Sequence, residues 1–179
     1  MTGAARVEVR AAAEMRAAGR KLEGWAAVFD TPARIGNFTE VVRRSAFDAA
    51  LASGADVIGV IDHDPGKLLA RRSSGTLRLS VDGKGLAFSL DVPDTQLGRD
   101  TLTLAERGDL GGCSFSFRCR RDAWPARDRR ELLDVELIDV AIVQSFPAYP
   151  NTAVAARARQ PMTLPTASFA LRRRLLEAL

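Results

Sequence analysis

The sequence has few of the side chains that bind metals or form disulfides. It contains one histidine, His63, and two cysteines, Cys113 and Cys119, with no Cys-x-x-Cys pair. A structural zinc site needs about four such ligands, so this composition argues against one. If both cysteines lie on one short strand, their Cα atoms are too far apart to bridge, and we expect reduced thiols. We expect neither a metal nor a cofactor.

Long apolar runs are also absent. None approaches the ~20 residues that a membrane-spanning helix requires. The N-terminal segment carries Arg6, Glu8 and Arg10 where a signal peptide would have an apolar core, so we expect the protein to stay inside the cell. The 179 residues, of which 46% are hydrophobic and 27% charged, suit one ordinary globular domain with a real core.

The basic character of the chain is confined to its C-terminal end. Residues 151–179 hold five arginines against one acid, Glu177, and so carry the whole formal net charge of +4. Aromatic residues do not interleave with these arginines, and no recognised binding motif is present. The charge distribution therefore argues against nucleic acid as a partner, and residues 157–179 are expected to form a flexible basic tail.

Short apolar or alternating runs predict a mostly β protein. The expected strands cover residues 6–10, 21–29, 38–42, 56–61, 76–81, 86–92, 113–119 and 131–143, the last as one bent strand or a pair. Asp82-Gly83-Lys84-Gly85 predicts a hairpin. Helices are expected at 95–107 and at 45–53, where Ser45 and Asp48 resemble a capping box. We therefore expect an antiparallel, barrel-like sheet with peripheral helices.

Three stretches lack a clear period. Residues 11–18 are rich in alanine and fit a helical turn or a loop that Gly19 ends. Residues 62–66 follow a buried strand and are expected to form a functional loop. Residues 122–130 are polar and are expected to form an exposed turn.

Ser114 is a candidate nucleophile. It follows the pair Gly111-Gly112, which lets a backbone or a substrate approach closely. On a strand, Ser114, Ser116 and Arg118 share one face, while Cys113, Phe115, Phe117 and Cys119 share the other, which can face the core. A serine on the outer face of a strand is also ordinary, so this pattern alone leaves both readings open.

A serine nucleophile needs a base, and His63 is the one histidine available. An imidazole can accept and return a proton near neutral pH. Three other readings stay open: a surface histidine that holds its loop, metal binding by Asp62, His63 and Asp64, and catalysis by Cys113. A thiol on the apolar face of a strand is more often inert.

Four ordered segments resemble the prohead (procapsid maturation) proteases of HK97-type tailed bacteriophages. These are Gly-Trp-Ala-Ala-Val-Phe at 24–29, Val-Ile-Asp-His-Asp at 60–64, Gly-Gly-Cys-Ser-Phe-Ser-Phe at 111–117, and Leu-Ile-Asp-Val-Ala-Ile-Val at 137–143 followed by Phe-Pro-Ala-Tyr-Pro at 146–150. The resemblance implies a serine protease with a fold related to the herpesvirus assemblins. It places the nucleophile at Ser114, the base at His63 and the orienting acid at Asp139. Asp134, Glu136, Asp62 and Asp64 remain alternatives for the acid.

The same resemblance implies a setting. The substrates would be the major capsid protein precursor and its scaffold segment, cleaved inside the immature capsid in the cytoplasm of the bacterial host. Residues 1–156 would form the protease domain and residues 157–179 a tail that docks on capsid or scaffold, or is self-cleaved. Analogy with assemblins suggests a homodimer. The alternative function is an inactive capsid-assembly or scaffolding protein that binds the major capsid protein.

Overall fold

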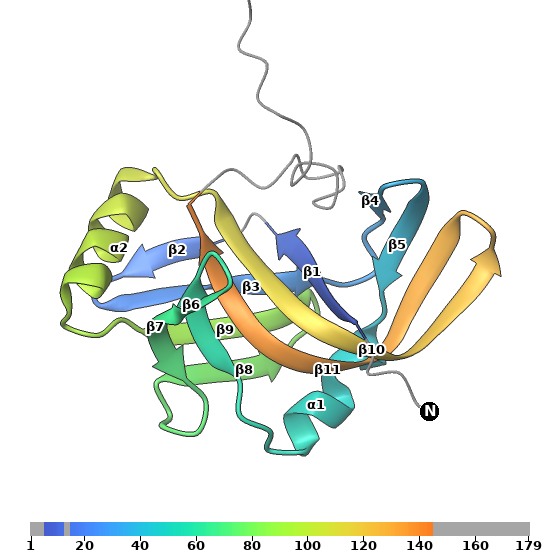
Figure 1. Cartoon of the computed structure of the whole chain (residues 1–179), viewed down its shortest axis with the longest axis horizontal. Coiled ribbons are helices and arrows are strands. Elements are labelled where there is room, and N and C mark those ends of the chain that lie inside the picture. The colour runs from blue at the N-terminus through green and yellow to red at the C-terminus, as the bar shows by residue number, and fades with distance from the viewer. Residues whose placement is uncertain (1–5, 13–14, 145–179) are drawn as a thin grey trace, which may run out of the picture.

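Strands dominate residues 6–12 and 15–144, the part of the chain that the computed structural model describes (Figure 1). The larger sheet contains seven strands: β1 (Val7–Ala12), β4 (Ala33–Ile35), β5 (Phe38–Val42), β6 (Ile58–Ile61), β7 (Asp64–Arg71), β10 (Gly112–Ala126) and β11 (Arg129–Val143). The smaller sheet has the order β2 (Met15–Ala18), β3 (Lys21–Val28), β9 (Gly85–Asp91) and β8 (Leu77–Val81). The predicted mostly β fold is confirmed.

β11 is the strand around which the larger sheet is built. It pairs antiparallel with β10 along one edge, and Figure 1 shows the two as a long curved ribbon across the molecule. Its other edge is shared by two parallel partners, β5 beside its first residues and β6 beside its last. The pairing is therefore mixed, and the described strands form two sheets that do not close into the barrel that the sequence suggested.

One continuous core joins the two sheets. Its largest fully buried side chains include Phe47, Phe115, Phe117 and Leu22. The rings of Phe47 and Phe115 meet edge to face at 5.5 Å, and those of Phe115 and Phe117 stack at 5.3 Å. The expectation that the aromatic face of the 113–119 strand packs into the core is confirmed.

The helices lie at the periphery, as expected. α2 (Gln96–Arg107) begins at Thr95, whose hydroxyl accepts the N–H of Gly98. The other helical segment starts as a 3₁₀ turn, η1 (Arg44–Phe47), and continues as α1 (Asp48–Ala52). The predicted capping box at Ser45 is wrong, because the Ser45 hydroxyl instead donates to the carbonyl of Leu133 at 3.4 Å.

Three of the irregular stretches are more regular than the sequence suggested. Apart from residues 13–14, which are not described, residues 11–18 are strand, because long-range pairing with β10 and β3 outweighs the weak preference of alanine. The expected loop at 62–66 is a two-residue turn, with β7 already beginning at Asp64. β10 runs to Ala126, where the ring of Trp124 packs 5.1 Å from that of Phe38.

Of the remaining expectations from the sequence, some concern described residues and others lie outside them. The hairpin at Asp82 is confirmed, since the Asp82 carboxylate accepts the N–H groups of Lys84 and Gly85 at 2.7 and 2.8 Å. Residues 129–143 form one strand rather than a pair. The predicted tail at 157–179 and the 146–150 segment lie outside the described residues.

Candidate active site

A tight turn places His63 at the end of β6. Ile61 pairs with Asp64, so Asp62 and His63 alone make the turn, with φ angles of 50° and 58°. Such positive angles at both positions are those of a type I′ hairpin turn. Asp62 fixes the turn to β11: its N–H donates to the carbonyl of Ile142 at 3.0 Å, and its carboxylate accepts the N–H of Gln144 at 2.9 Å.

The pairing of β10 with β11 supplies the other polar side chains. Ser114 lies opposite Ala141, and Ser116 lies opposite Asp139. The parallel partner β6 places Ile58 beside Asp139, and the turn that carries His63 begins four residues after Ile58. The consecutive strands β10 and β11 thus converge on one spot with β6, which lies far from them in the sequence.

The imidazole of His63 lies between Ser114 and Asp139. Its Nδ1 is 2.7 Å from Oδ1 of Asp139, and its Nε2 is 2.8 Å from Oγ of Ser114. Ser114 is 1% exposed and Asp139 7%, whereas the His63 side chain is 20% exposed. The three residues singled out from the sequence are brought into one hydrogen-bonded chain, in the order serine, imidazole, carboxylate.

Three of the other acids that could have oriented His63 bind other groups, and the fourth, Asp134, lies further along β11. Asp62 binds the backbone of Gln144, and Asp64 accepts the N–H of Gly66 at 2.9 Å. Glu136 pairs with Arg118 and with Arg120. Asp134 lies opposite Arg121, several residues along β11. Among the acids considered from the sequence, Asp139 is the one whose carboxylate meets the imidazole.

Two further contacts were not anticipated. The hydroxyl of Ser116 donates to Oδ2 of Asp139, so both carboxylate oxygens are bonded, one to His63 and one to Ser116. The Ser114 hydroxyl donates to the main-chain carbonyl of Arg10 at 2.6 Å. The sequence did place Ser116 on the face of Ser114, which was a usable signal; no local pattern indicates the Arg10 contact.

A buried charge cluster anchors β1 beside this site. The Arg10 guanidinium binds both oxygens of Glu40 and, at 2.8 Å, Glu8. Arg130 also binds Glu8 and Glu40, at 2.6 and 3.1 Å. Burial raises the pKa of Glu8, but hydrogen bonds and charge from Arg130 and Arg10 outweigh it, so that its pKa lies below the ordinary value.

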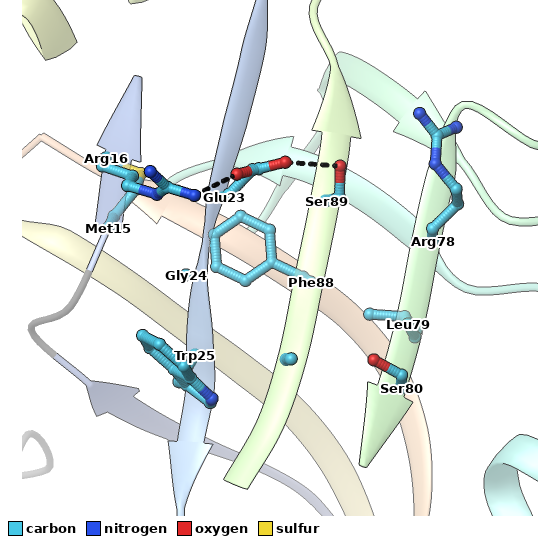
Figure 2. A pocket seen from close by; sticks show the side chains of 11 residues that line it. Met15, Arg16, Glu23, Gly24, Trp25, Arg78, Leu79, Ser80, Phe88 and Ser89 are labelled. Atoms are coloured by element: carbon cyan, nitrogen blue, oxygen red, sulfur yellow. Dashed lines mark hydrogen bonds and ion pairs between the residues drawn. The ribbon is translucent and has the colours of Figure 1, made fainter. Parts of the chain in front are cut away.

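A cavity lies in another part of the molecule. About 650 Å³ in volume, it covers the four-stranded sheet and is lined by residues of β2, β3, β8 and β9, among them Trp25, Leu79 and Phe88 (Figure 2). None of His63, Ser114 and Asp139 lines it. The hydrogen-bonded chain of Ser114, His63 and Asp139 therefore lies outside this hollow.

Within residues 6–12 and 15–144, no three His, Cys, Asp or Glu side chains are grouped as metal ligands. No helix in this part of the chain has the length and apolar character needed to cross a membrane. Cys113 and Cys119 are both unbridged, as expected from their position on one strand. Burial raises the pKa of the Cys119 thiol.

Comparison with known families identifies the family of the chain. A family model described as caudovirus prohead serine protease matches residues 5–165, most of the chain, and spans all three residues of the hydrogen-bonded chain. Searches of curated proteins and of solved structures give no match. The suggested relation to assemblins therefore stays a prediction. On the extent of the family match, the chain belongs to the caudovirus prohead serine proteases.

Proposed function

We propose that this protein is a serine endopeptidase that cleaves the capsid precursor or its scaffold segment during prohead maturation. Membership of a prohead protease family supports the general activity and an encounter with capsid proteins. The observation that carries the specific proposal is the chain from Ser114 through His63 to Asp139, with steps of 2.8 and 2.7 Å. This is the arrangement that activates a serine hydroxyl for attack on a peptide carbonyl.

The proposed reaction has two halves. Oγ of Ser114 bonds to the scissile carbonyl carbon while its proton passes to Nε2 of His63, and His63 then gives that proton to the leaving amine as the C–N bond breaks. Water next attacks the acyl-enzyme, its proton passes to His63, and His63 returns it to Oγ as the ester bond breaks. The new carboxyl terminus leaves, and Ser114 and His63 are regenerated.

Asp139 acts on this reaction through His63. A carboxylate facing Nδ1 favours the tautomer that carries its proton there, which leaves Nε2 free to accept the serine proton. The same charge stabilises the imidazolium that forms during each half-reaction. Ser116 is a positioning residue, because its hydroxyl binds the second oxygen of Asp139 and thereby fixes the carboxylate plane.

The rival nucleophile is poorly placed. The Cys113 thiol is fully buried on the opposite face of β10 and donates to the carbonyl of Trp25 at 2.9 Å. It therefore points away from His63, as the alternation along a strand requires. The rival function, an inactive scaffolding protein, is not favoured by membership of a protease family.

The setting completes the proposal. The partners are the major capsid protein precursor and its scaffold segment, met inside the prohead in the host cytoplasm. We assign residues 1–156 to the protease domain and residues 157–179 to a basic tail, although the family match runs on to residue 165. Homodimerisation, carried over from the assemblins, is kept as part of the proposal.

The deciding experiment is co-expression of the protein with its cognate capsid precursor, followed by intact mass of the capsid protein. The wild type should shorten the capsid protein, and Ser114→Ala should leave it at full length. Ser80→Ala, an exposed serine on β8, is the matched control and should cleave like the wild type. Cys113→Ala should retain cleavage.

Retained cleavage in Ser114→Ala would remove Ser114 as the nucleophile. A capsid protein that co-assembles with the wild type but stays at full length would favour the scaffolding role instead.

A further inference from the structure

The N-terminal strand covers the proposed nucleophile. β1 pairs antiparallel with β10 over six residues, from Val7 opposite Arg118 to Ala12 opposite Cys113, and Ala11 lies opposite Ser114. The Arg10 carbonyl is 2.6 Å from the hydroxyl of Ser114, a residue that is 1% exposed. A peptide substrate cannot reach a hydroxyl that is buried to this degree, so this arrangement is closed.

The contact with Arg10 also determines which acceptor the hydroxyl proton of Ser114 binds. A serine hydroxyl has one proton and can donate it to one acceptor at a time. While that proton is bound to the Arg10 carbonyl, it is not directed at Nε2 of His63, which must receive it for Ser114 to become a nucleophile. The carbonyl of β1 therefore competes with the general base.

β1 occupies a position on β10 at which a substrate peptide can bind and from which it can leave. It is the outermost strand beside β10 in the seven-stranded sheet, so it can leave without breaking any other strand pair of that sheet. Its departure would expose the backbone N–H and C=O groups of β10 that now pair with it, and an extended peptide can bind such an edge by adding a strand. Backbone amides beside a nucleophile are also what an oxyanion hole requires.

The side chain of Arg10 enters an acidic site at Glu40, which it shares with Arg130. Glu40, 2% exposed, binds the Arg10 guanidinium with both carboxylate oxygens, and the guanidinium lies 5.3 Å from the centre of the Phe117 ring. Paired contacts from one carboxylate and an aromatic face select a basic side chain by geometry as well as by charge.

We propose that β1 stands in the place of the substrate, which binds β10 as an extended strand and is cut after an arginine or lysine held by Glu40. This inference rests on the proposed function. The register of β1 puts the carbonyl of the residue at position 10 on Ser114, so that residue precedes the scissile bond. Ser114 donates a hydrogen bond to the carbonyl oxygen of Arg10 instead of attacking the carbonyl carbon. This makes β1 a blocking strand.

A reversible lock tests the blocking role. Val7 and Arg118 face each other across the two strands and are partly exposed, and a disulfide can span such a pair. The full-length Val7→Cys/Arg118→Cys protein should lose cleavage when oxidised and regain it when reduced. Arg118→Cys alone, carried through both treatments, controls for oxidation of Cys113 and Cys119.

A fluorophosphonate probe measures the departure of β1 from β10 without a substrate. Its attachment to Ser114, followed by intact mass, should be at least about tenfold slower in the oxidised lock than in the reduced form, because the probe reacts only with the open fraction. Glu8→Ala/Arg10→Ala, which removes both β1 side chains that hold the strand to Arg130 and Glu40, should react about tenfold faster than the wild type. Equal rates in the two lock states, or no acceleration in Glu8→Ala/Arg10→Ala, would overturn the blocking role.

The outcomes separate the two proposals. A wild type that neither cleaves the capsid precursor nor reacts with the probe at Ser114 contradicts the proposed function, and the inference falls with it. A wild type that reacts and cleaves, with an oxidised lock as active as the reduced one, leaves the protease in place and overturns the inference alone.

The cleavage position tests the specificity. Tandem mass spectrometry of the shortened capsid protein should find Arg or Lys immediately before the cut, and an acidic or apolar residue there would overturn the role of Glu40. Peptides spanning that site, with the basic residue kept or replaced by Gln, should differ about 10- to 100-fold in kcat/KM. In Glu40→Gln this ratio should fall towards one, whereas Glu131→Gln, which removes a carboxylate bound to Arg43, should keep it.

The ratio is the useful readout because Glu40→Gln also loosens β1. A looser β1 changes the rate for both peptides equally and cancels from the ratio. Should Glu40→Gln fail to fold, the mapped wild-type cut still decides.

Discussion

The smaller sheet has an open, hollowed face, whereas the site at the start of β10, where Ser114 lies, is closed. Surface shape and the proposed chemistry therefore point to different regions of the molecule. The open face carries the cavity of about 650 Å³, with Trp25, Leu79 and Phe88 in its lining (Figure 2). The N-terminal end of β10 has almost no exposed surface at Ser114, yet Ser114 belongs to the hydrogen-bonded chain of hydroxyl, imidazole and carboxylate. Concavity is a common sign of a binding site, but here the proposed chemistry lies where a strand of the protein fills the space.

The polar groups in the two regions also differ in cost. At the cavity, the pair between Arg16 and Glu23 is largely exposed, and such pairs contribute about 0–1 kcal/mol. At the closed site, Ser114, Ser116 and Asp139 are nearly fully buried, and each has a hydrogen-bond partner. Removing one partner of a buried polar group costs about 1–3 kcal/mol. A sequence optimised for stability alone would place apolar side chains there, so the polar cluster points to function.

After Ser114→Ala, the largest effect should come from Asp139→Asn. An amide facing Nδ1 of His63 can donate to it, which moves the imidazole proton to Nε2 and removes the acceptor that Ser114 needs. We expect kcat to fall roughly 10³- to 10⁴-fold, measured on a peptide that carries the mapped cleavage site. Asp64→Asn, at the partly exposed neighbour of His63, should stay within about twofold of the wild type. Full activity in Asp139→Asn would contradict the orienting role.

Ser116→Ala should have an intermediate effect. The change removes the donor to Oδ2 of Asp139 and leaves Ser114 and His63 unchanged. We expect kcat to fall about tenfold with little change in KM, since one hydrogen bond to a charged group is lost. Ser116→Thr, which keeps the hydroxyl, should recover part of the rate. A fall in thermal stability without a fall in kcat would make Ser116 purely structural.

A smaller effect should appear in the pH dependence of stability. The folded-state pKa of Glu8 lies below its ordinary value of 4.5, so its contribution is complete above that pH and is lost as the pH falls through the folded pKa. Thermal unfolding of Glu8→Gln should therefore differ most from the wild type above pH 4.5, with the two converging at more acidic pH. Glu106→Gln, exposed on α2, should run parallel to the wild type; a constant gap for Glu8→Gln would refute the linkage.

The smallest effect should come from the cavity. Ser80→Trp places a large side chain in the lining of the hollow, far from the proposed chemistry. Cleavage of the capsid precursor should be unchanged, as judged by the rate at which full-length capsid protein disappears. A marked loss of cleavage in a folded Ser80→Trp protein would mean that the open face takes part in substrate binding, and the contrast between the two regions would break down.

Elements whose geometry is set by nearby residues could be predicted from the sequence. The hairpin at Asp82 follows from one carboxylate accepting the N–H groups two and three residues later, and the start of α2 follows from the Thr95 cap. The 11–18 stretch could not be predicted in this way. Its alanines have no strong β preference, and their strands form because β10 and β3 lie alongside.

The same distinction applies to the candidate site. Ser114 and His63 stand out locally, one beside two glycines and the other as the lone histidine. Choosing Asp139 from the residues alone was not possible, because the choice depends on the parallel register between β11 and β6. The family resemblance supplied that residue. The covering of Ser114 by β1 involves positions about a hundred residues apart, which no local pattern relates.

At the turn formed by Asp62 and His63, the residues that would stabilise the fold most differ from those that the proposed reaction needs. Two successive residues with positive φ favour Asn-Gly, and each side chain larger than glycine costs roughly 1 kcal/mol in that conformation. A consensus or stability-guided redesign would therefore favour glycine at residue 63. The redesigned protein would be expected to melt at a higher temperature and to have lost its only imidazole. Selection for heat resistance is thus an unsafe route to better variants of this protein.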